Sequence, residues 1–255
     1  MNTLVKYVLY DILRNRMVIA YAVFLLLVSI SLFYLEGNPA KGTLGLLNVV
    51  LIVLPLVSII FATIHFYNSY EFIELLVAQP LQRKRILISE YIGICSSLIL
   101  AFLIGIGVPI LLFNPSETGF ALIFAGVTLT AAFVSLAFFA SVISRDKAKG
   151  IGIALMLWFY FALIYDGLVL FFLFSFSDYP LEKMMVVLTA LNPIDLGRIV
   201  VMLKMDVSAL MGYTGAVYKD FFGTNWGMFY ALGFMLIWII VPFAIAIRFF
   251  EKKDL

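Results

Sequence analysis

Residues that bind metals or form disulfides are almost missing from this sequence. Its 255 residues include one cysteine, Cys95, and one histidine, His65. A single cysteine excludes a disulfide within the chain, and one residue of each kind argues against a Cys/His zinc site, which needs four ligands. We expect no metal here and interpret Cys95, which lies in an apolar run, as a small buried hydrophobic residue.

A phosphate-binding loop is also missing. The sequence contains no G-x-x-x-x-G-K-[ST] motif, and no polar stretch is long enough for a nucleotide-binding domain. We therefore expect no cofactor on this chain; if ATP drives the protein, ATP and Mg²⁺ bind to a separate chain. Charged residues make up only 13% of the sequence and the net charge is +2, so no basic field indicates a nucleic-acid partner.

Apolar residues are abundant, at 64% of the chain, and the mean hydropathy is +1.12. A soluble protein averages about half apolar residues, and a membrane span needs about 20 of them in a row. The sequence predicts an all-α polytopic membrane protein, a single transmembrane domain over residues 1–255 with a long outer loop before the last span. We expect an amphipathic interfacial helix at 4–16 and six spans at 17–35, 44–66, 86–113, 120–143, 151–174 and 226–247.

The basic residues are distributed unevenly between the two ends of these spans. Five lie on one side: Lys41, Lys183, Arg198, Lys204 and Lys219. The other twelve of the 17 lie in both termini and the two middle loops. Because cytoplasmic loops carry an excess of Lys and Arg, we expect both termini in the cytoplasm and the segment 175–225 on the outer side.

Two polar segments on the predicted cytoplasmic side are candidates for contact with a partner. Residues 71–78 have helical periodicity, with apolar residues on one face and two glutamates off it, which suits docking into a groove. An interfacial helix with a basic anchor is the alternative for this segment. Residues 144–150 (SRDKAKG) form either a second contact or a plain turn. The residues assigned to this contact are Glu71, Phe72, Glu74, Leu75, Leu76, Gln79, Pro80, Arg83, Arg145 and Asp146.

Two carboxylates lie within apolar runs. Asp166, next to Tyr165 in the middle of the fifth span, is costly at this depth, and such residues usually have a function. We expect these two residues in a pathway or a helix interface, the alternative being a structural hydrogen bond. Glu90 lies near the start of the third span, with Arg85 nearby, and we interpret it as structural because a carboxylate favours a helix N-terminus.

The outer segment contains a second helix signal, LNPIDLGRIVVM. Asn192 is placed to cap a helix, with Pro193 in the first turn and Asp195 favourable to the helix dipole. We expect this helix at the outer interface, with Asn192, Asp195, Arg198, Met202 and Met205 meeting a partner, and a re-entrant helix remains open for segment 175–225. Met202 and Met205 share a face and thioethers are soft ligands for Cu(I), although methionines also simply fill apolar faces.

Other function classes fit less well. An intramembrane aspartyl protease needs two carboxylates that share a site, and no second mid-span carboxylate joins Asp166; His65 has no apparent partner either. No inverted repeat is visible, which argues against a self-contained secondary transporter. A channel or scaffold subunit remains as an alternative, although few polar side chains lie in mid-span.

The assembled features resemble the permease subunits of ABC-2-type transporters. The resemblance covers the N-terminal helix, six spans, the long loop before the sixth span and the basic tail, and E-x-x-E-L-L-x-A-Q-P-L-x-R at 71–83 is similar to the region of that family that docks onto the ATPase. The chain is most similar to the NosY-type permeases linked to nitrous oxide reductase maturation. The similar stretches are LLVAQPLQRKRILISEYIG, SRDKAKGIGIALMLWFYFALIYDGLVL and LNPIDLGRIVVM.

That resemblance implies a set of partners and a location. It implies a homodimeric permease in a bacterial inner membrane, a pair of cytosolic ABC ATPase subunits that bind ATP and Mg²⁺, and a periplasmic protein seated on the outer loops. It further implies a role in supplying the copper-sulfur centre of the reductase. The permease itself is then not an enzyme.

Overall fold

A computed structural model of the chain describes residues 2–78, 82–176, 182–204 and 225–252. The described residues are almost entirely helical, and six helices are long and apolar enough to span a membrane, as expected. The first three are α2 (Arg16–Glu36), α3 (Pro39–Asn68) and the segment formed by α5 (Arg83–Phe102), η1 (Leu103–Gly107) and α6 (Val108–Phe113). The other three are α7 (Glu117–Ile143), the segment formed by α8 (Lys147–Phe159), η2 (Tyr160–Ile164) and α9 (Tyr165–Ser175), and α13 (Asn225–Lys252).

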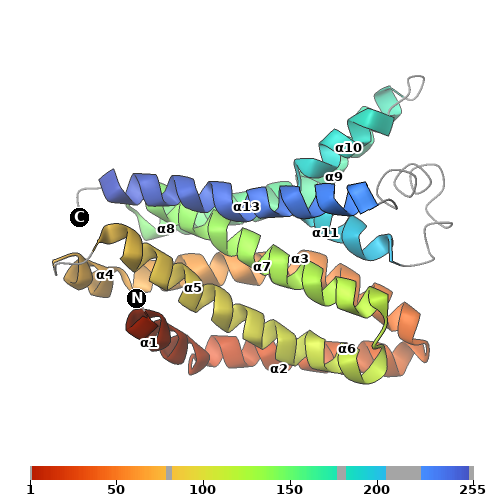
Figure 1. Cartoon of the computed structure of the whole chain (residues 1–255), viewed down its shortest axis with the longest axis horizontal. Coiled ribbons are helices and arrows are strands. Elements are labelled where there is room, and N and C mark those ends of the chain that lie inside the picture. Colours follow the sequence, from red (N-terminus) through yellow and green to blue (C-terminus); the bar gives the residue numbers. More distant parts are fainter. Residues whose placement is uncertain (1, 79–81, 177–181, 205–224, 253–255) are drawn as a thin grey trace.

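Four shorter helices complete the described structure: α1 (Asn2–Leu13), α4 (Tyr70–Val77), α10 (Glu182–Ala190) and α11 (Pro193–Met202). Figure 1 shows the long helices side by side, with both termini, α1 and α4 at one end, which we call the terminal end. The other end of the bundle, with α6 and the α2–α3 turn, is called the far end.

The core of the bundle is built around α7. It packs against α3, α13, α11, α5 and α8, and 67% of its apolar window is buried. By contrast, only 11% of the corresponding window in the α8–η2–α9 span is buried. This span therefore presents most of its apolar surface outward.

Helix boundaries follow local capping. Asn38 caps α3 by accepting a hydrogen bond from the Ala40 amide at 2.9 Å, and Pro39 occupies the first turn. Gly37 ends α2 with a φ of 56°, a left-handed conformation that suits glycine. The connection between α2 and α3 is therefore a tight turn, and α3 begins five residues before the predicted start at 44.

Two spans are interrupted by a turn of π-helix, which often occurs at functional sites. In η1, the Gly105 carbonyl accepts a hydrogen bond from the Ser29 hydroxyl of α2 at 3.0 Å. In η2, the Phe161 carbonyl accepts one from the Asn192 side-chain amide at 3.0 Å. Each irregular turn is thus tied to another helix by a buried polar contact.

The outer segment is not only a surface helix. α10 and α11 meet at an angle of 114°, and α11 packs against α7 and α13. Leu196 and Val201 of α11 are fully buried. The apolar face of α11 packs against protein, as the alternative of a re-entrant helix predicts for this helix, whereas α10 projects away from the bundle (Figure 1). We call α10 and α11 together the bent hairpin.

Candidate functional site

The helix α4 is a short amphipathic helix on the terminal end. Ile73 and Leu76 face the bundle and are buried, whereas Glu71, Glu74 and Leu75 are exposed, with Leu75 at 67%. The expected apolar face is therefore divided: Leu76 packs within the chain, Phe72 is half-buried, and Leu75 is exposed on the same side of α4 as Glu71 and Glu74. An exposed leucine beside charged residues on a short helix suits docking into a groove of a partner.

The loop before α8 lies against the end of α3, which immediately precedes α4. The Tyr67 hydroxyl donates to the Ser141 and Ser144 carbonyls, at 3.2 and 3.1 Å. The Lys147 ammonium group donates to the Asn68 side-chain carbonyl at 2.8 Å. The two polar segments that were predicted separately therefore belong to one surface.

Charges of both signs meet on this surface. Burial raises the pKa of the Tyr70 phenol above its usual value, the Glu74 carboxylate raises it further, and the Arg145 guanidinium opposes both effects. Glu74 and Arg145 thus act on the same side chain from different segments. We call Glu71, Glu74, Leu75 and Arg145 the coupling surface.

The remaining residues assigned to this surface have other positions. Asp146 caps α8, because its carboxylate accepts a hydrogen bond from the Lys149 amide at 3.0 Å. Arg83 is half-buried and its guanidinium lies 3.4 Å from the Glu251 carbonyl of α13. Gln79 and Pro80 lie outside the described residues.

A second polar cluster lies in the half of the bundle next to the bent hairpin. The Arg198 guanidinium of α11 donates to the Asp166 carboxylate at 3.0 Å and to the Asp195 carboxylate at 2.9 Å. Asp166 lies in the first turn of α9, immediately after η2. We call Asp166, Asp195, Arg198 and Asn192 the outer clasp, since they join the fifth span to the bent hairpin.

Asn192 completes the clasp. Its side-chain oxygen accepts from the Ile194 amide at 2.9 Å, and its amide nitrogen donates to the Phe161 carbonyl and, at 3.2 Å, to Asp195. The Tyr165 hydroxyl also donates to the Leu188 carbonyl of α10. Asn192 is fully buried and its polar atoms bond to groups within the chain, and its contact with a partner stays a prediction.

The methionines give no support to a metal site. Met202 is half-buried and packs against the core, and Met205 lies outside the described residues. Within the part of the chain that the structure describes, no group of three or more His, Cys, Asp and Glu residues is arranged to hold a metal.

A buried pair was missed by sequence reasoning. The His65 Nε2 lies 3.6 Å from a Glu90 carboxylate oxygen and 3.3 Å from the Ser69 hydroxyl. Glu90 is 2% exposed, and it faces α3 and not Arg85, which is exposed. The signal was present, since the second and third spans are antiparallel and both residues lie near the same end.

The chain is similar to known proteins over almost its whole length. Residues 3–255 match the family described as ABC-2 family transporter protein. The chain is 28% identical over 232 residues to the "Probable ABC transporter permease protein NosY" of Pseudomonas aeruginosa, covering 82% of this chain and 84% of that protein. It is also 28% identical over 215 residues to the protein of the same description from Stutzerimonas stutzeri, covering 75% and 77%.

Proposed function

Because this chain belongs to the ABC-2 family of transporter proteins and is a membrane-spanning permease subunit, we propose that it works with a separate ATPase chain. ATP hydrolysis on that chain is converted into movement of the bent hairpin. ATP and Mg²⁺ bind on that partner. The permease lies in a bacterial inner membrane. Its two termini and the coupling surface are on the cytoplasmic side, in line with the excess of basic residues on that side.

The observation that carries this proposal is the composition of the coupling surface. Leu75 is 67% exposed beside Glu71 and Glu74, and the end of α3 that precedes this helix is joined to the loop before α8 by the Tyr67 and Lys147 hydrogen bonds. An apolar anchor in a charged rim is the usual make-up of a protein contact. Because these hydrogen bonds join the segment before α4 to the loop before α8, a force on α4 is transmitted to the spans.

The fifth span offers a direct route from this surface to the outer side. It begins at Asp146 in the cytoplasmic loop, continues through η2, and carries Asp166, whose carboxylate accepts a hydrogen bond from Arg198 of the bent hairpin. A displacement of the loop before α8 is passed along one continuous helical segment to the outer clasp. Because the clasp consists of paired charges and hydrogen bonds, the hairpin follows the span.

The exposed faces of the permease suit association with a second copy. The α8–η2–α9 span is 11% buried and α2 is 28% buried in their apolar windows, far less than α7. We assign these faces to a homodimer, which pairs two permeases with two ATPases. The outer hairpins of the two copies then act on a periplasmic partner.

The similarity to the two NosY proteins suggests the biological setting. We assign the permease to maturation of the copper-sulfur centre of nitrous oxide reductase, through export or through action on a periplasmic protein. The chain needs no metal site of its own for this role.

The test is copurification of the tagged chain from its native membranes in mild detergent, followed by an ATPase assay of the complex. Leu75→Glu places a charge at the anchor, and we expect loss of the ATPase partner. Leu112→Glu is the matched control, because Leu112 of α6 is 74% exposed at the far end of the bundle and lies outside the faces assigned to the homodimer. Retention of a functional ATPase by the Leu75→Glu protein contradicts the coupling proposal, and recovery of the wild-type chain without any ATPase favours a channel or scaffold.

A further inference from the structure

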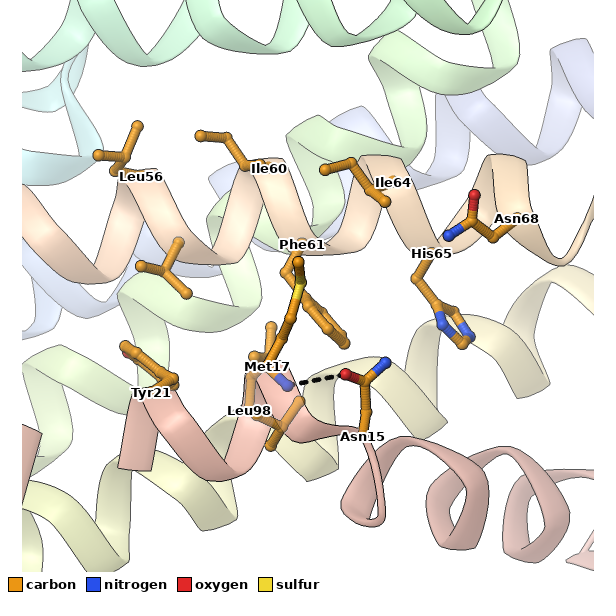
Figure 2. A pocket seen from close by; sticks show the side chains of 12 residues that line it. Asn15, Met17, Tyr21, Leu56, Ile60, Phe61, Ile64, His65, Asn68 and Leu98 are labelled. Atoms are coloured by element: carbon orange, nitrogen blue, oxygen red, sulfur yellow. Dashed lines mark hydrogen bonds between the residues drawn. The ribbon is translucent and has the colours of Figure 1, made fainter. Parts of the chain in front are cut away.

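A cavity of about 470 Å³ lies between α2, α3 and α5, toward the terminal end (Figure 2). Ligand sites in proteins typically have volumes of about 300–1,000 Å³. The cavity follows from the packing of α2 and α3. Near the far end these helices are in close contact. Because glycine has no side chain, Gly42 leaves room for the Phe33 side chain and Gly45 leaves room for the Leu32 side chain. No such glycine lies on the α3 side of the cavity, which runs from Leu56 to Asn68.

The length of the cavity matches one leaflet of a bilayer. Its α3 wall extends from Leu56 to Asn68, which are twelve positions apart, and a helix rises 1.5 Å per residue, so this wall is about 18 Å long. One leaflet contributes about half of the 30 Å hydrocarbon core. The cavity therefore reaches from the polar boundary of the membrane to about its middle.

The lining is divided into an apolar part and a polar end. Val18, Tyr21, Val57, Ile60 and Leu98 surround the deeper part. Asn15, His65 and Asn68 lie together at the terminal end in Figure 2, where Asn15 also accepts a hydrogen bond from the Met17 amide at 2.9 Å. A compact polar ligand would leave the apolar walls without contacts, whereas an amphiphile with one polar end satisfies both parts.

Three cations lie next to residues of the polar end in the sequence or in space, although none of them lines the cavity itself, and the Arg14 guanidinium lies over the Tyr10 ring, 5.5 Å from its centroid. Arg14 and Arg16 flank Asn15, both are exposed, and neither forms an ion pair with any residue that the structure describes. The Lys147 ammonium group lies 2.8 Å from the Asn68 side-chain oxygen. Three cations at the membrane boundary complement a phosphate group.

We propose that this cavity binds one phospholipid from the leaflet at the terminal end, with an acyl chain along α3 and the phosphate held near Arg14, Arg16 and Lys147. The cavity lining contains no residue of the coupling surface, and the site shares with the proposed coupling route only the Lys147–Asn68 hydrogen bond. It fills the space between α2 and α3, so the bound chain takes part in fixing the first span against the bundle.

The wild-type protein provides the first test. The chain is reconstituted in phosphatidylethanolamine vesicles containing a small fraction of phosphatidylglycerol with a photoactivatable group at the acyl-chain end. After illumination, we expect cross-links to peptides that contain Leu56, Val57, Ile60 or Leu98. Cross-links confined to the exposed face of α8–α9 overturn the proposal, as do cross-links between the cavity residues and a second copy of the chain in place of lipid.

Matched variants provide the second test, with phosphatidylglycerol affinity measured by native mass spectrometry of the delipidated protein. Val57→Trp fills the cavity, whereas Ile52→Trp adds the same side chain at a site on α3 that is 51% exposed. We expect binding of the first phospholipid to be lost in Val57→Trp and kept in Ile52→Trp. Arg14→Gln and Arg16→Gln should each weaken it about fivefold. Equal binding by all four variants and the wild type overturns the proposal. If Val57→Trp misfolds, the cross-linking experiment on the wild-type protein decides the proposal.

Discussion

At the scale of single residues, the most consequential arrangement is one guanidinium shared by two carboxylates. Arg198 and Asp166 are about one-third exposed at the side chain, and Asp195 is 15% exposed. Such a cluster is sensitive to the loss of one member, since the remaining charges stay in a poorly solvated place. It also explains why an aspartate is accommodated within the fifth span.

Replacing Asp166 tests this arrangement. We expect Asp166→Leu to destabilise the protein by about 1–3 kcal/mol, less than for a fully buried pair because of the partial exposure. Asp166→Asn retains a hydrogen-bond acceptor and should be tolerated better. Thermal unfolding in detergent measures both variants, with Glu117→Gln as the control, since the Lys204–Glu117 pair is 38% and 81% exposed. Equal stability of the Asn and Leu variants would contradict a polar role for Asp166.

Gly150 tests the attachment of the coupling surface. A Cβ atom at this position would collide with the Tyr67 ring and hydroxyl, whereas a Cβ at Gly152 meets nothing within 4 Å. Gly150→Ala should therefore displace Tyr67, cost about 1–3 kcal/mol and reduce coupled ATPase activity. Gly152→Ala should be neutral or stabilising by up to about 1 kcal/mol, because alanine favours a helix.

Chemical unfolding and ATPase assays of the purified complex measure both glycine variants. Tyr67→Phe removes the two hydroxyl hydrogen bonds without a steric clash, and a drop in coupling for this variant assigns the effect to the bonds. If both glycine variants behave alike, the close contact with Tyr67 does not matter.

At the scale of secondary-structure elements, two helices begin with the same Asn-Pro signal but in different surroundings. Asn38 caps α3 in an exposed turn, while Asn192 caps α11 and also donates to the π-helical turn η2. The signal therefore does no more than start a helix at Asn38. At Asn192 it starts a helix and also supplies a contact between helices.

Substitution of the two asparagines separates these roles. Asn38→Ala should cost about 1 kcal/mol, the usual value of a helix cap. Asn192→Ala should cost about 2–4 kcal/mol, because it also removes the side-chain donor to the Phe161 carbonyl and one of the two donors to Asp195. Asn192→Asp keeps the cap and removes the donor, so its loss of stability should exceed that of Asn38→Ala. If Asn192→Ala loses no more stability than Asn38→Ala, Asn192 acts only as a helix cap.

The sequence was sufficient for elements whose signal is local. Apolar runs of span length predict six spanning helices, and six are found. The helix starts lie earlier than predicted because caps such as Asn38 and Asp146 and the first-turn Pro39 extend helices into polar residues. The π-helical turns escaped prediction, because an apolar run has the same composition with or without an extra residue in a turn.

Contacts between distant segments were less predictable. The position of Asp166 in an apolar span predicts a polar partner. The sequence does not identify that partner as Arg198, because this contact depends on the packing of α11 against α7 and α13. The His65–Glu90 contact depends only on two neighbouring spans, and charge and chain direction together contained enough information to suggest it.

At the scale of the whole molecule, the terminal end gathers the surfaces assigned to the cytoplasm. Both termini, α1 and α4 lie there, and the α2–α3 turn lies at the far end (Figure 1). Cys95, the single cysteine, is 8% exposed, so labelling experiments have little background.

Cysteine accessibility tests the orientation directly. In a Cys95→Ala background, Arg145→Cys and Glu36→Cys place one thiol at each end of the bundle, both at exposed positions. We expect a membrane-impermeant maleimide added to intact spheroplasts to label position 36, and to label position 145 only after lysis. Labelling of position 145 in intact spheroplasts would invert the topology and move the coupling surface outside the cell.

The packing of α13 on α7 has a consequence for biosynthesis. The Ser135 hydroxyl of α7 donates to the Ile239 carbonyl of α13 at 2.6 Å, and α13 follows α7 only after the fifth span and the bent hairpin. Domains fold from the N-terminal side as the ribosome proceeds. Until α13 is inserted, the face of α7 that it covers therefore lacks its partner helix, and the Ser135 hydroxyl lacks the Ile239 carbonyl. We expect a nascent chain arrested after the fifth span to expose this face of α7.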